Sequence, residues 1–366
     1  MNPKKIIHLI TTIEFGGAEK QLLILAANQV KQGLEVEVFY LKGKPELKIK
    51  FEEVGVKVNS LLVNQPFIFQ VTKFRKFIRS NESPVHTHLP QAELVASLAC
   101  KKKNFIISRH NFEPFWPKKP KLISVLLSRF VTSRASSAIA ISNAIKNYLV
   151  MTKEVSKEFQ VSVVYYGFEQ EVDNQSDLKE ITYELLNSTK NYKLGTIGRL
   201  VPGKNYSTML KAVAKIAGVD PTIKFFVVGG GSSERELIKM CKDLKIEGNV
   251  IWLGRTEYIR DFLSKIDLFI FASKGEGFGL VLLEAMLANK PILAANNSAI
   301  PEVLGSNYKG LFSTNDYKLL SDRIIDLMND HTKSESLVTG YKEQIKLFDP
   351  VDMANNVLKI YKAAGF

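Results

Sequence analysis

Residues 266–286 read IDLFIFASKGEGFGLVLLEAM and contain the pattern on which the fold depends. The apolar run Leu268–Ala272 predicts a buried strand, and the region near 279–289 predicts a helix. Three glycines, at positions 275, 277 and 279, lie in the turn that joins them. A strand followed by a glycine-rich turn and a helix is the first half of a βαβ unit, the building block of parallel sheets covered by helices.

The same alternation of short apolar runs and helical patterns extends in both directions along the chain. It forms two series, separated by the polar stretch 168–191, which has no strand pattern. Two such series predict an α/β protein of two Rossmann-like domains, with parallel sheets that face each other across a central ligand cleft. We place these domains at 1–170 and 171–349, followed by a last segment at 350–366.

The individual elements follow from hydrophobic period and from turn residues. The predicted strands are Ile6–Thr11, Val36–Leu41, Val56–Leu62, Val85–Thr87, Phe105–Ser108, Ala138–Ile141, Val161–Tyr165, Tyr192–Ile197, Ile223–Val228, Val250–Trp252, Leu268–Ala272 and Ile292–Ala295. The predicted helices are Ala18–Gln32, Phe69–Arg79, Gln91–Lys101, Asn143–Val150 (with Ser142 as N-cap) and those near 205–217, 233–246, 257–265, 279–289, 315–330, 334–347 and 350–363.

Charge is distributed unevenly between the two halves. The chain of 366 residues has a formal net charge of +13, of which residues 1–170 account for +12 and residues 171–366 for +1. A basic half suggests an anionic partner: nucleic acid, a membrane surface or a phosphorylated substrate. On charge alone, a basic surface that serves only solubility is an equally good interpretation.

The cysteine content and the N-terminal sequence indicate the cellular compartment in which we expect the protein. The two cysteines, Cys100 and Cys241, allow neither a disulfide framework nor a cysteine-rich zinc site, which fits a reducing cytoplasm. The first apolar run is interrupted by Glu14 and is too short for a signal peptide or a membrane span. We therefore expect a cytoplasmic protein that is at most peripheral on the inner face of the cell membrane.

Two further glycine-rich turns follow predicted strands. Gly16 and Gly17 lead into the first helix, where backbone N–H groups and the helix dipole favour a phosphate, although tight strand–helix turns are common without one. The second turn, Gly229–Ser232, has no further glycine at the dinucleotide fingerprint spacing, which argues against an NAD or FAD enzyme.

Two cations and two carboxylates mark the loops of the second half. Arg199 and Lys204 lie in GRLVPGKN (198–205) after its first strand, where they could hold a diphosphate or form a solvated basic turn. Glu276 precedes the helix near 279–289, and Glu284 lies two turns inside it, so they are suited to grip hydroxyls at two points of an elongated ligand. A carboxylate on an apolar helix is costly to bury without a partner. The N–H groups at its start, those of Phe278, Gly279 and Leu280, could point at phosphate oxygens.

Three strings together resemble the family 4 glycosyltransferases: GGAEK at 16–20, GRLVPGKN at 198–205 and EGFGLVLLEAM at 276–286. The last contains the family's Glu-x7-Glu motif. Supporting strings are WLG at 252–254, IDLFIFAS at 266–273 and KPILAANNSAIPEVLG at 290–305. The resemblance runs from about residue 5 to 330. It implies the GT-B fold, a donor bound mainly by the second domain, and a last helix at 350–363 that crosses back to the first.

The resemblance also implies roles for the matching residues. Arg199 and Lys204 would stabilise the departing nucleoside diphosphate. Glu284 would bind the ribose hydroxyls, and Glu276 would hold the donor sugar near its anomeric carbon. The Gly16 and Gly17 loop would close on the phosphates.

Further positions match the family less directly. Arg255 and Thr256 fall where its base-contacting segment lies. Its histidine near the donor sugar best matches His110, which leaves Arg109 and Asn111 for the acceptor side.

The remaining histidines offer little support for a metal. His86 and His88 share one face of a strand, but no third ligand is evident, so we interpret them as structural or, for His88, as acceptor-lining. His8 is expected in the core. Because no Asp-x-Asp occurs, we predict no metal site and no cofactor, with cations and helix dipoles in place of Mg²⁺.

The prediction is a retaining hexosyl- or N-acetylhexosaminyltransferase of EC class 2.4. The donor would be a nucleotide sugar, with UDP-sugars favoured by the resemblance, and the acceptor a lipid-linked saccharide or polysaccharide precursor of bacterial surface glycans. Since the donor's phosphates fall in the nearly neutral half, the basic half is left for an anionic membrane surface. The alternatives are a catalytically silent glycosyltransferase-like subunit and a basic nucleic-acid-binding protein. Aromatic residues are sparse among the basic clusters, so no nucleic acid is expected.

Overall fold

The computed structural model describes residues 4–80, 83–117, 119–169, 186, 191–256 and 258–366. Most of the linker predicted at 168–191 therefore lies outside the described residues. The chain divides into two compact units. We call Met1–Glu169 with Phe348–Phe366 the N-terminal domain, and Gln170–Leu347 the C-terminal domain.

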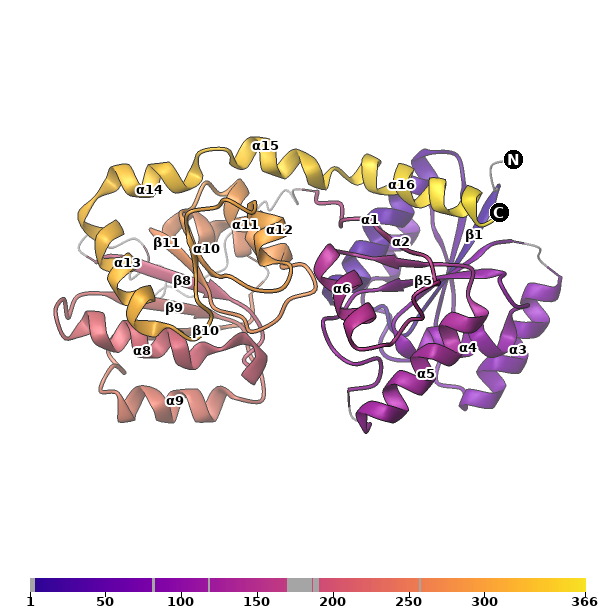
Figure 1. Cartoon of the computed structure of the whole chain (residues 1–366), viewed down its shortest axis with the longest axis horizontal. Coiled ribbons are helices and arrows are strands. Elements are labelled where there is room, and N and C mark those ends of the chain that lie inside the picture. The colour runs from indigo at the N-terminus through magenta and orange to yellow at the C-terminus, as the bar shows by residue number, and fades with distance from the viewer. Residues whose placement is uncertain (1–3, 81–82, 118, 170–185, 187–190, 257) are drawn as a thin grey trace. The chain divides into compact units, whose positions relative to one another are not determined.

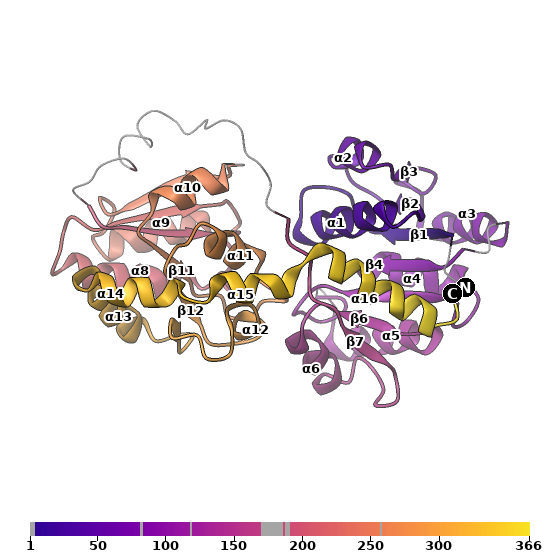
Figure 2. The same cartoon turned by 90° about the horizontal axis from the view of Figure 1, so that it is seen from above.

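The N-terminal domain is built on a seven-stranded parallel sheet with helices on both faces (Figures 1 and 2). Its strand order is β3-β2-β1-β4-β5-β6-β7. The strands are β1 (Lys5–Ile10), β2 (Glu35–Tyr40), β3 (Lys57–Asn59), β4 (Val85–His88), β5 (Phe105–Arg109), β6 (Ala138–Ala140) and β7 (Val161–Val163). The helices are α1 (Gly17–Lys31), α2 (Lys48–Glu53), α3 (Phe67–Arg79), α4 (Pro90–Ala99), α5 (Lys121–Arg134), α6 (Asn143–Met151) and α16 (Pro350–Ala363).

The last helix of the chain completes the core of the N-terminal domain. Asp349 caps α16 by accepting from the N–H groups of Val351 and Asp352. Met353, Val357 and Tyr361 of this helix are buried against α1 and the sheet. The N-terminal sheet is thus covered partly by residues from the other end of the sequence.

The C-terminal domain repeats the architecture with six parallel strands in the order β10-β9-β8-β11-β12-β13. These are β8 (Lys193–Ile197), β9 (Lys224–Val228), β10 (Val250–Gly254), β11 (Leu268–Phe271), β12 (Ile292–Ala295) and β13 (Leu311–Phe312). The helices are α8 (Tyr206–Ala217), α9 (Glu234–Asp243), α10 (Ile259–Lys265), α11 (Leu280–Leu287), α12 (Ile300–Leu304), α13 (Tyr317–Asn329), α14 (His331–Val338) and α15 (Tyr341–Ile345). Among the described residues, 3-10 turns occur at Pro202–Lys204 and, at the boundary with the N-terminal domain, at Lys346–Phe348.

The structure confirms most predicted elements, and Ser142 caps α6 through its hydroxyl. The single helix predicted at 334–347 is wrong. It is two helices, α14 and α15, because Gly340 adopts a φ of 90° between them, a conformation that ends a helix. Four elements were not predicted: α2, α5, α12 and β13.

Candidate functional site

Each sheet reverses its strand order once, between β1 and β4 in the N-terminal domain and between β8 and β11 in the C-terminal domain. In open α/β sheets, ligands bind outside the carboxyl ends of the strands at such a switch point. The candidate site residues on the loops after β1, β4, β5, β8 and β11 therefore lie at the positions where this fold places ligands.

In the C-terminal domain, the loops after β8, β9 and β10 are joined by backbone hydrogen bonds. The N–H of Gly198 donates to Val228, and that of Gly229 donates to Gly254. Gly229 has a φ of 139°, and a Cβ there would collide with the carbonyl oxygen of Gly198. The glycines at 229–231 thus allow two strand-end loops to pack together, and Arg255 lies against the second of them, Gly230.

Lys204 and Glu276 form an ion pair across the switch point, with 2.5 Å between Nζ and Oε1. Their side chains are 21% and 13% exposed, and the Lys204 ammonium lies 5.3 Å from the centre of the Phe271 ring. Arg199, on the same loop as Lys204, is exposed. The structure thus brings together two site residues that the sequence separates by 72 positions.

Polar residues that the sequence analysis did not single out hold the Glu276 loop in place. The N–H of Glu276 donates to the Ser298 hydroxyl at 2.8 Å. The Asn297 amide donates to the carbonyl of Ser273 and to the hydroxyl of Thr314. The Ser273 hydroxyl in turn donates to the carbonyl of Gly203. The sequence offered one sign of Asn297 and Ser298 as site residues. They belong to the Asn-Asn-Ser run within the string at 290–305, and this run follows a strand, as the other site loops do.

The start of α11 is shaped by Gly279, whose φ of 97° is accessible to glycine at little cost. Phe278 is buried beneath the turn, and α11 begins at Leu280. Glu284 is half-buried one turn into this helix. The Thr256 hydroxyl accepts a hydrogen bond from the N–H of Tyr258 at 3.1 Å.

In the N-terminal domain, Gly16 is the N-cap of α1 and Gly17 is exposed at its first position. Gly16 leaves space for the carboxylate of Glu19, which folds back over the turn and accepts a hydrogen bond from the Thr12 hydroxyl at 2.7 Å. Burial raises the pKa of Glu19. The first turn of α1 therefore holds an acidic side chain close to the loop.

His110 and His88 lie in a hydrogen-bonded group at the ends of β4 and β5, in which His88 is buried and His110 is half-buried. His88 Nδ1 is 3.1 Å from His110 Nε2, and His110 Nδ1 is 2.6 Å from the Tyr166 hydroxyl. Burial lowers the pKa of His110 to about 3 and that of His88 well below its usual value, so both are neutral near pH 7. Their roles at a substrate remain predictions, and both nitrogens of each ring already have partners within the domain.

The sequence argument that His86 and His88 lack a third companion is wrong. His8 lies beside both, because β1 and β4 pair with His8 opposite His86. One ring nitrogen from each of the three lies within 4.8 Å of the others, an arrangement that could hold a metal ion. The expectation of metal independence therefore stays a prediction.

Arg109 is buried in an ion-pair network rather than extended from its strand end. Its guanidinium contacts Glu93 at 2.9 Å and Glu154 at 3.2 Å, and it lies 4.6 Å from the centre of the Phe115 ring. Burial raises the pKa of Glu93 to about 7, although Arg109 opposes this. Asn111, two residues further, is exposed. The acceptor-side assignment of both residues stays a prediction, and the guanidinium already balances two carboxylates.

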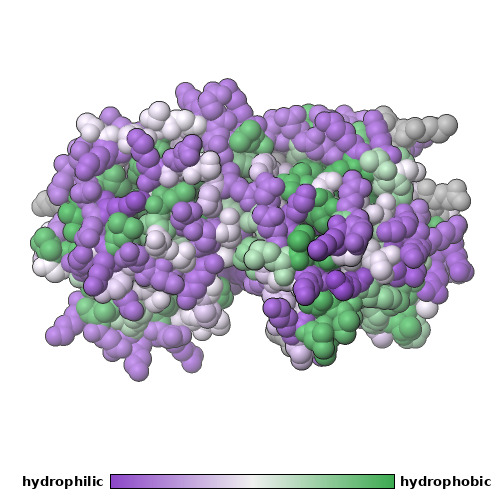
Figure 3. Space-filling model, viewed as in Figure 1, coloured by the Kyte–Doolittle hydropathy of each residue, from purple (hydrophilic) through white to green (hydrophobic). Residues whose placement is uncertain are grey.

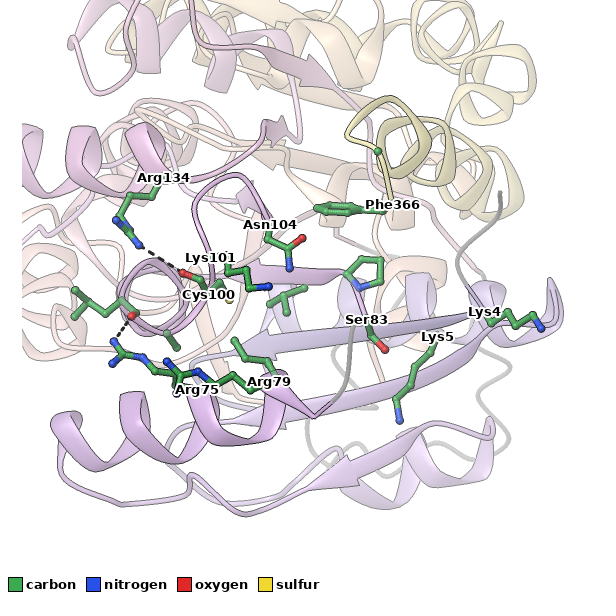
Figure 4. A pocket seen from close by; sticks show the side chains of 16 residues that line it. Lys4, Lys5, Arg75, Arg79, Ser83, Cys100, Lys101, Asn104, Arg134 and Phe366 are labelled. Atoms are coloured by element: carbon green, nitrogen blue, oxygen red, sulfur yellow. Dashed lines mark hydrogen bonds between the residues drawn. The ribbon is translucent and has the colours of Figure 1, made fainter.

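A basic cavity of about 800 Å³ lies elsewhere in the N-terminal domain, near the amino ends of its strands (Figure 4). Arg75 donates to the carbonyl of Leu98, and Arg134 donates to those of Ser97 and Cys100. These carbonyls lie at the end of α4, where cations satisfy a helix C-terminus. We therefore attribute two of its cations to helix capping rather than to ligand binding.

Within the described residues, no helix has both the length and the apolar character that crossing a bilayer requires.

The two-domain architecture is shared with proteins of known structure. The solved structure of Anabaena Alr3699/HepE in complex with UDP and glucose superposes with a TM-score of 0.81 at 21% identity, covering 98% of this chain and all of that one. The two parallel-sheet domains are those of the GT-B glycosyltransferases.

Family models define the chain more narrowly. The model of Glycosyltransferase Family 4 matches residues 15–172, and that of Glycosyl transferases group 1 matches residues 179–344. The chain belongs to glycosyltransferase family 4.

Two relatives illustrate the breadth of that family. The capsular polysaccharide biosynthesis glycosyltransferase CapM of Staphylococcus aureus is 25% identical over 229 residues, and the match spans 60% of each chain. The N-acetylgalactosamine-N,N'-diacetylbacillosaminyl-diphospho-undecaprenol 4-alpha-N-acetylgalactosaminyltransferase of Campylobacter jejuni is 22% identical over 378 residues, covering 97% of this chain and 99% of that one.

Proposed function

We propose that the protein is a retaining glycosyltransferase that moves a sugar from a nucleotide-sugar donor to a lipid-linked or polysaccharide-precursor acceptor in bacterial surface glycan synthesis. The observation that carries this proposal is the Lys204–Glu276 pair at the switch point of the C-terminal sheet. It combines a cation suited to a diphosphate with a carboxylate suited to sugar hydroxyls. The names of the Staphylococcus and Campylobacter relatives support the glycan role.

Catalysis would be electrostatic. When the bond between the anomeric carbon and the diphosphate breaks, negative charge develops on the leaving phosphate. Lys204 and Arg199, on a loop whose backbone is bonded to its neighbours, would stabilise that charge once Lys204 exchanges the Glu276 carboxylate for the phosphate. In the structure the carboxylate of Glu276 is paired with Lys204. Its negative charge lessens the repulsion between Lys204 and Arg199, the two cations of this loop.

Retention would follow from front-face attack. The acceptor hydroxyl would approach the anomeric carbon on the side of the departing diphosphate and pass its proton to that phosphate. Glu276 would hold the sugar hydroxyls and Glu284 the ribose, while the amide N–H groups at the start of α11 would face the phosphates. This route assigns no carboxylate as a nucleophile and asks for no metal.

We propose a UDP-sugar as donor, with an N-acetylhexose or a hexose as the transferred group and GDP-mannose as the next candidate. The solved structure of HepE with UDP-glucose supports a UDP-sugar. A thermal-shift screen against UDP-, GDP- and ADP-sugars, followed by a turnover assay with the stabilising donor, tests this directly. Stabilisation and turnover with a UDP-sugar are expected. No stabilisation by any of these donors, together with no turnover, would overturn the proposed function.

The acceptor side is argued from helix α5, whose amphipathicity is inverted. Its buried face consists of Ser124, Ser128 and Thr132, with Val131, whereas Leu122 and Leu126 are 70% and 58% exposed. Ile123 and Phe130 extend the exposed apolar stripe. A helix normally turns its apolar stripe inward, so an exposed stripe of this kind marks an interaction surface.

Two features support the proposal that this surface meets an anionic membrane. Basic side chains flank the stripe at Lys119, Lys121 and Arg129, and the start of α3 exposes a second apolar cluster, Phe67–Phe69. Figure 3 shows hydrophobic side chains among hydrophilic ones over the region of α5. An apolar stripe bordered by lysine and arginine is the composition of helices that lie in a bilayer interface.

Co-sedimentation with vesicles tests the membrane proposal separately from the chemistry. Phosphatidylglycerol vesicles should retain the protein at low salt, and pure phosphatidylcholine vesicles should retain much less. Equal binding to both would overturn the proposed anionic surface while leaving the donor proposal intact.

A further inference from the structure

Three histidines of the N-terminal domain, His110, His88 and His8, belong to one continuous series of hydrogen bonds. The Tyr166 hydroxyl is 2.6 Å from His110 Nδ1, and His110 Nε2 is 3.1 Å from His88 Nδ1. His88 Nε2 is 3.0 Å from His8 Nδ1, and His8 Nε2 is 2.8 Å from the amide oxygen of Gln29. The series thus runs from the segment after β7, through the sheet, to the last turn of α1.

The chemistry of these groups gives the series one direction. An amide oxygen only accepts, so the hydrogen between Gln29 and His8 is on His8 Nε2. A neutral imidazole has one N–H and one acceptor nitrogen, so His8 Nδ1 must accept from His88 Nε2–H. Because His88 donates through Nε2, its Nδ1 must accept, and the donor is His110 Nε2–H. His110 Nδ1 in turn accepts the hydroxyl hydrogen of Tyr166.

Burial keeps every member in the protonation state that this direction needs. It lowers the pKa of His8 to about 4 and that of His110 to about 3, and it raises the pKa of the Tyr166 hydroxyl. An imidazolium within the series would place two N–H groups against each other at one of its contacts. Neutral rings are therefore favoured by solvation and by hydrogen bonding together.

A second branch starts from the same glutamine. The Gln29 amide N–H donates to the Tyr361 hydroxyl at 3.2 Å, which donates in turn to His86 Nδ1 at 2.7 Å. His86 Nε2–H then donates to the Ser108 hydroxyl at 2.8 Å. Both branches therefore take their direction from the orientation of one amide, and Tyr361 links them to α16.

We infer that Gln29 fixes His110 in the Nε2–H form, so that His110 presents Nδ1 to the strand-end loops as an obligate hydrogen-bond acceptor. Gln29, His8 and His88 are then positioning residues for His110. The catalytic consequence rests on the proposed function: a donor-sugar hydroxyl that contacts His110 would replace the Tyr166 hydroxyl at Nδ1 and would have to donate. The tautomer itself does not depend on the reaction.

Histidine-selective ¹⁵N NMR of the full chain reads the tautomers directly. The protein has five histidines, and the fifth, His331, is exposed on α14 and provides an internal reference. We expect His8, His86, His88 and His110 to be neutral Nε2–H forms at pH 7. A neutral Nδ1–H form or a charged ring at His8, His88 or His110 would overturn the inference.

Variants of Gln29 test whether the glutamine sets the direction. Gln29→Leu should introduce the Nδ1–H form at His8 and, through the series, at His110. Gln29→Glu restores an acceptor and should restore the Nε2–H form at both. The matched control is Gln32→Leu, because Gln32 also bonds α16, through Asn355, but lies outside the series. An unchanged His110 tautomer in folded Gln29→Leu would overturn the role of Gln29, and if that variant does not fold, an Nδ1–H form in Gln29→Glu would do so.

Addition of Zn²⁺ provides a further test of the inference, because His8, His86 and His88 are grouped closely enough to bind it. Every nitrogen of these rings already has a hydrogen-bond partner, so equimolar Zn²⁺ should leave their ¹⁵N signals unchanged. Stoichiometric shifts of all three would overturn the inference in favour of a metal site.

Steady-state kinetics with the UDP-sugar that the protein turns over test the catalytic consequence. Gln29→Leu should lower kcat about tenfold, the effect of one ordinary hydrogen bond, whereas Gln32→Leu should stay within about twofold. An altered tautomer with unchanged kcat would overturn the positioning role. Absence of turnover by the wild-type protein would overturn the proposed function and this consequence with it, while the spectrum would still decide the tautomer.

Discussion

The two domains share a parallel sheet with one reversal of strand order, yet their strand-end loops carry opposite chemistry. In the N-terminal domain the titratable groups near the reversal are buried, neutral histidines and an arginine enclosed between carboxylates. In the C-terminal domain they are a partly exposed ion pair and an exposed arginine. Buried groups fix geometry but tie it to folding stability, whereas exposed charges contribute little to stability and remain available to a ligand.

The largest expected effect comes from removing the buried cation. Arg109→Met leaves Glu93 and Glu154 buried together without their partner, and we expect the free energy of unfolding to fall by about 3–5 kcal/mol. Urea denaturation followed by circular dichroism measures this. The partly exposed counterpart, Lys204→Met, should lower stability less, by about 1 kcal/mol. Equal losses in the two variants would break the comparison.

Acid should weaken the N-terminal domain through its histidines. Their folded pKa values lie below the unfolded value of about 6.5, so the unfolded state takes up protons first and stability falls as pH drops from about 6.5 to about 4. The slope is about 1.4 kcal/mol per pH unit for each histidine. Glu93, with a pKa raised to about 7, and Glu19 and Glu154, whose pKa values are also raised, act in the opposite direction but are three groups against four.

Urea midpoints at pH 7, 6 and 5 measure this dependence. His8→Asn should reduce the slope by the share of one histidine, and His331→Gln, at an exposed position, should leave it unchanged. Stability that is flat or rises between pH 6.5 and 5 would contradict the prediction.

The partly exposed Lys204–Glu276 pair should affect turnover more than folding. Lys204→Ala should lower turnover at least about tenfold, or about 1.4 kcal/mol of transition-state stabilisation, with an unchanged circular dichroism spectrum. Lys274→Ala, which removes an exposed cation from the neighbouring loop, is the matched control and should stay within about twofold. Wild-type turnover in Lys204→Ala would remove Lys204 from the reaction.

The smallest effect on stability is expected on helix α5. Replacing Leu122 and Leu126 together by Gln removes apolar surface that is already exposed, so the free energy of unfolding should change by no more than about 0.5 kcal/mol. Retention on phosphatidylglycerol vesicles should nevertheless fall at least about tenfold, since each leucine side chain buried in lipid contributes roughly 1.5–3 kcal/mol. A large loss of stability would show that the stripe packs within the protein.

The sequence predicted the sheets well because buried strands are short apolar runs bounded by turn residues. It failed at α5, where the stripe faces outward and small polar residues face inward, the reverse of the pattern that identifies a helix. It also failed at Gly340, whose positive φ divides one helical pattern into two helices.

The candidate site divides in the same way into features set by local sequence and features set by contacts between distant segments. The loops and their residue types were predictable from strand–turn–helix patterns. The contact of Lys204 with Glu276 and the place of His8 beside His86 were not, because both depend on strand order and register between segments far apart in the sequence.

Under the proposed function, the exposed apolar stripe of α5 determines which acceptor concentration controls the reaction rate. An enzyme held on a bilayer encounters a lipid-linked acceptor by diffusion in two dimensions, so its rate follows the mole fraction of acceptor in the surface. Diluting a fixed amount of acceptor with more bilayer should then slow the reaction, even though the acceptor's concentration in the tube is unchanged. Meanwhile the donor, which arrives from water, would keep ordinary three-dimensional saturation behaviour.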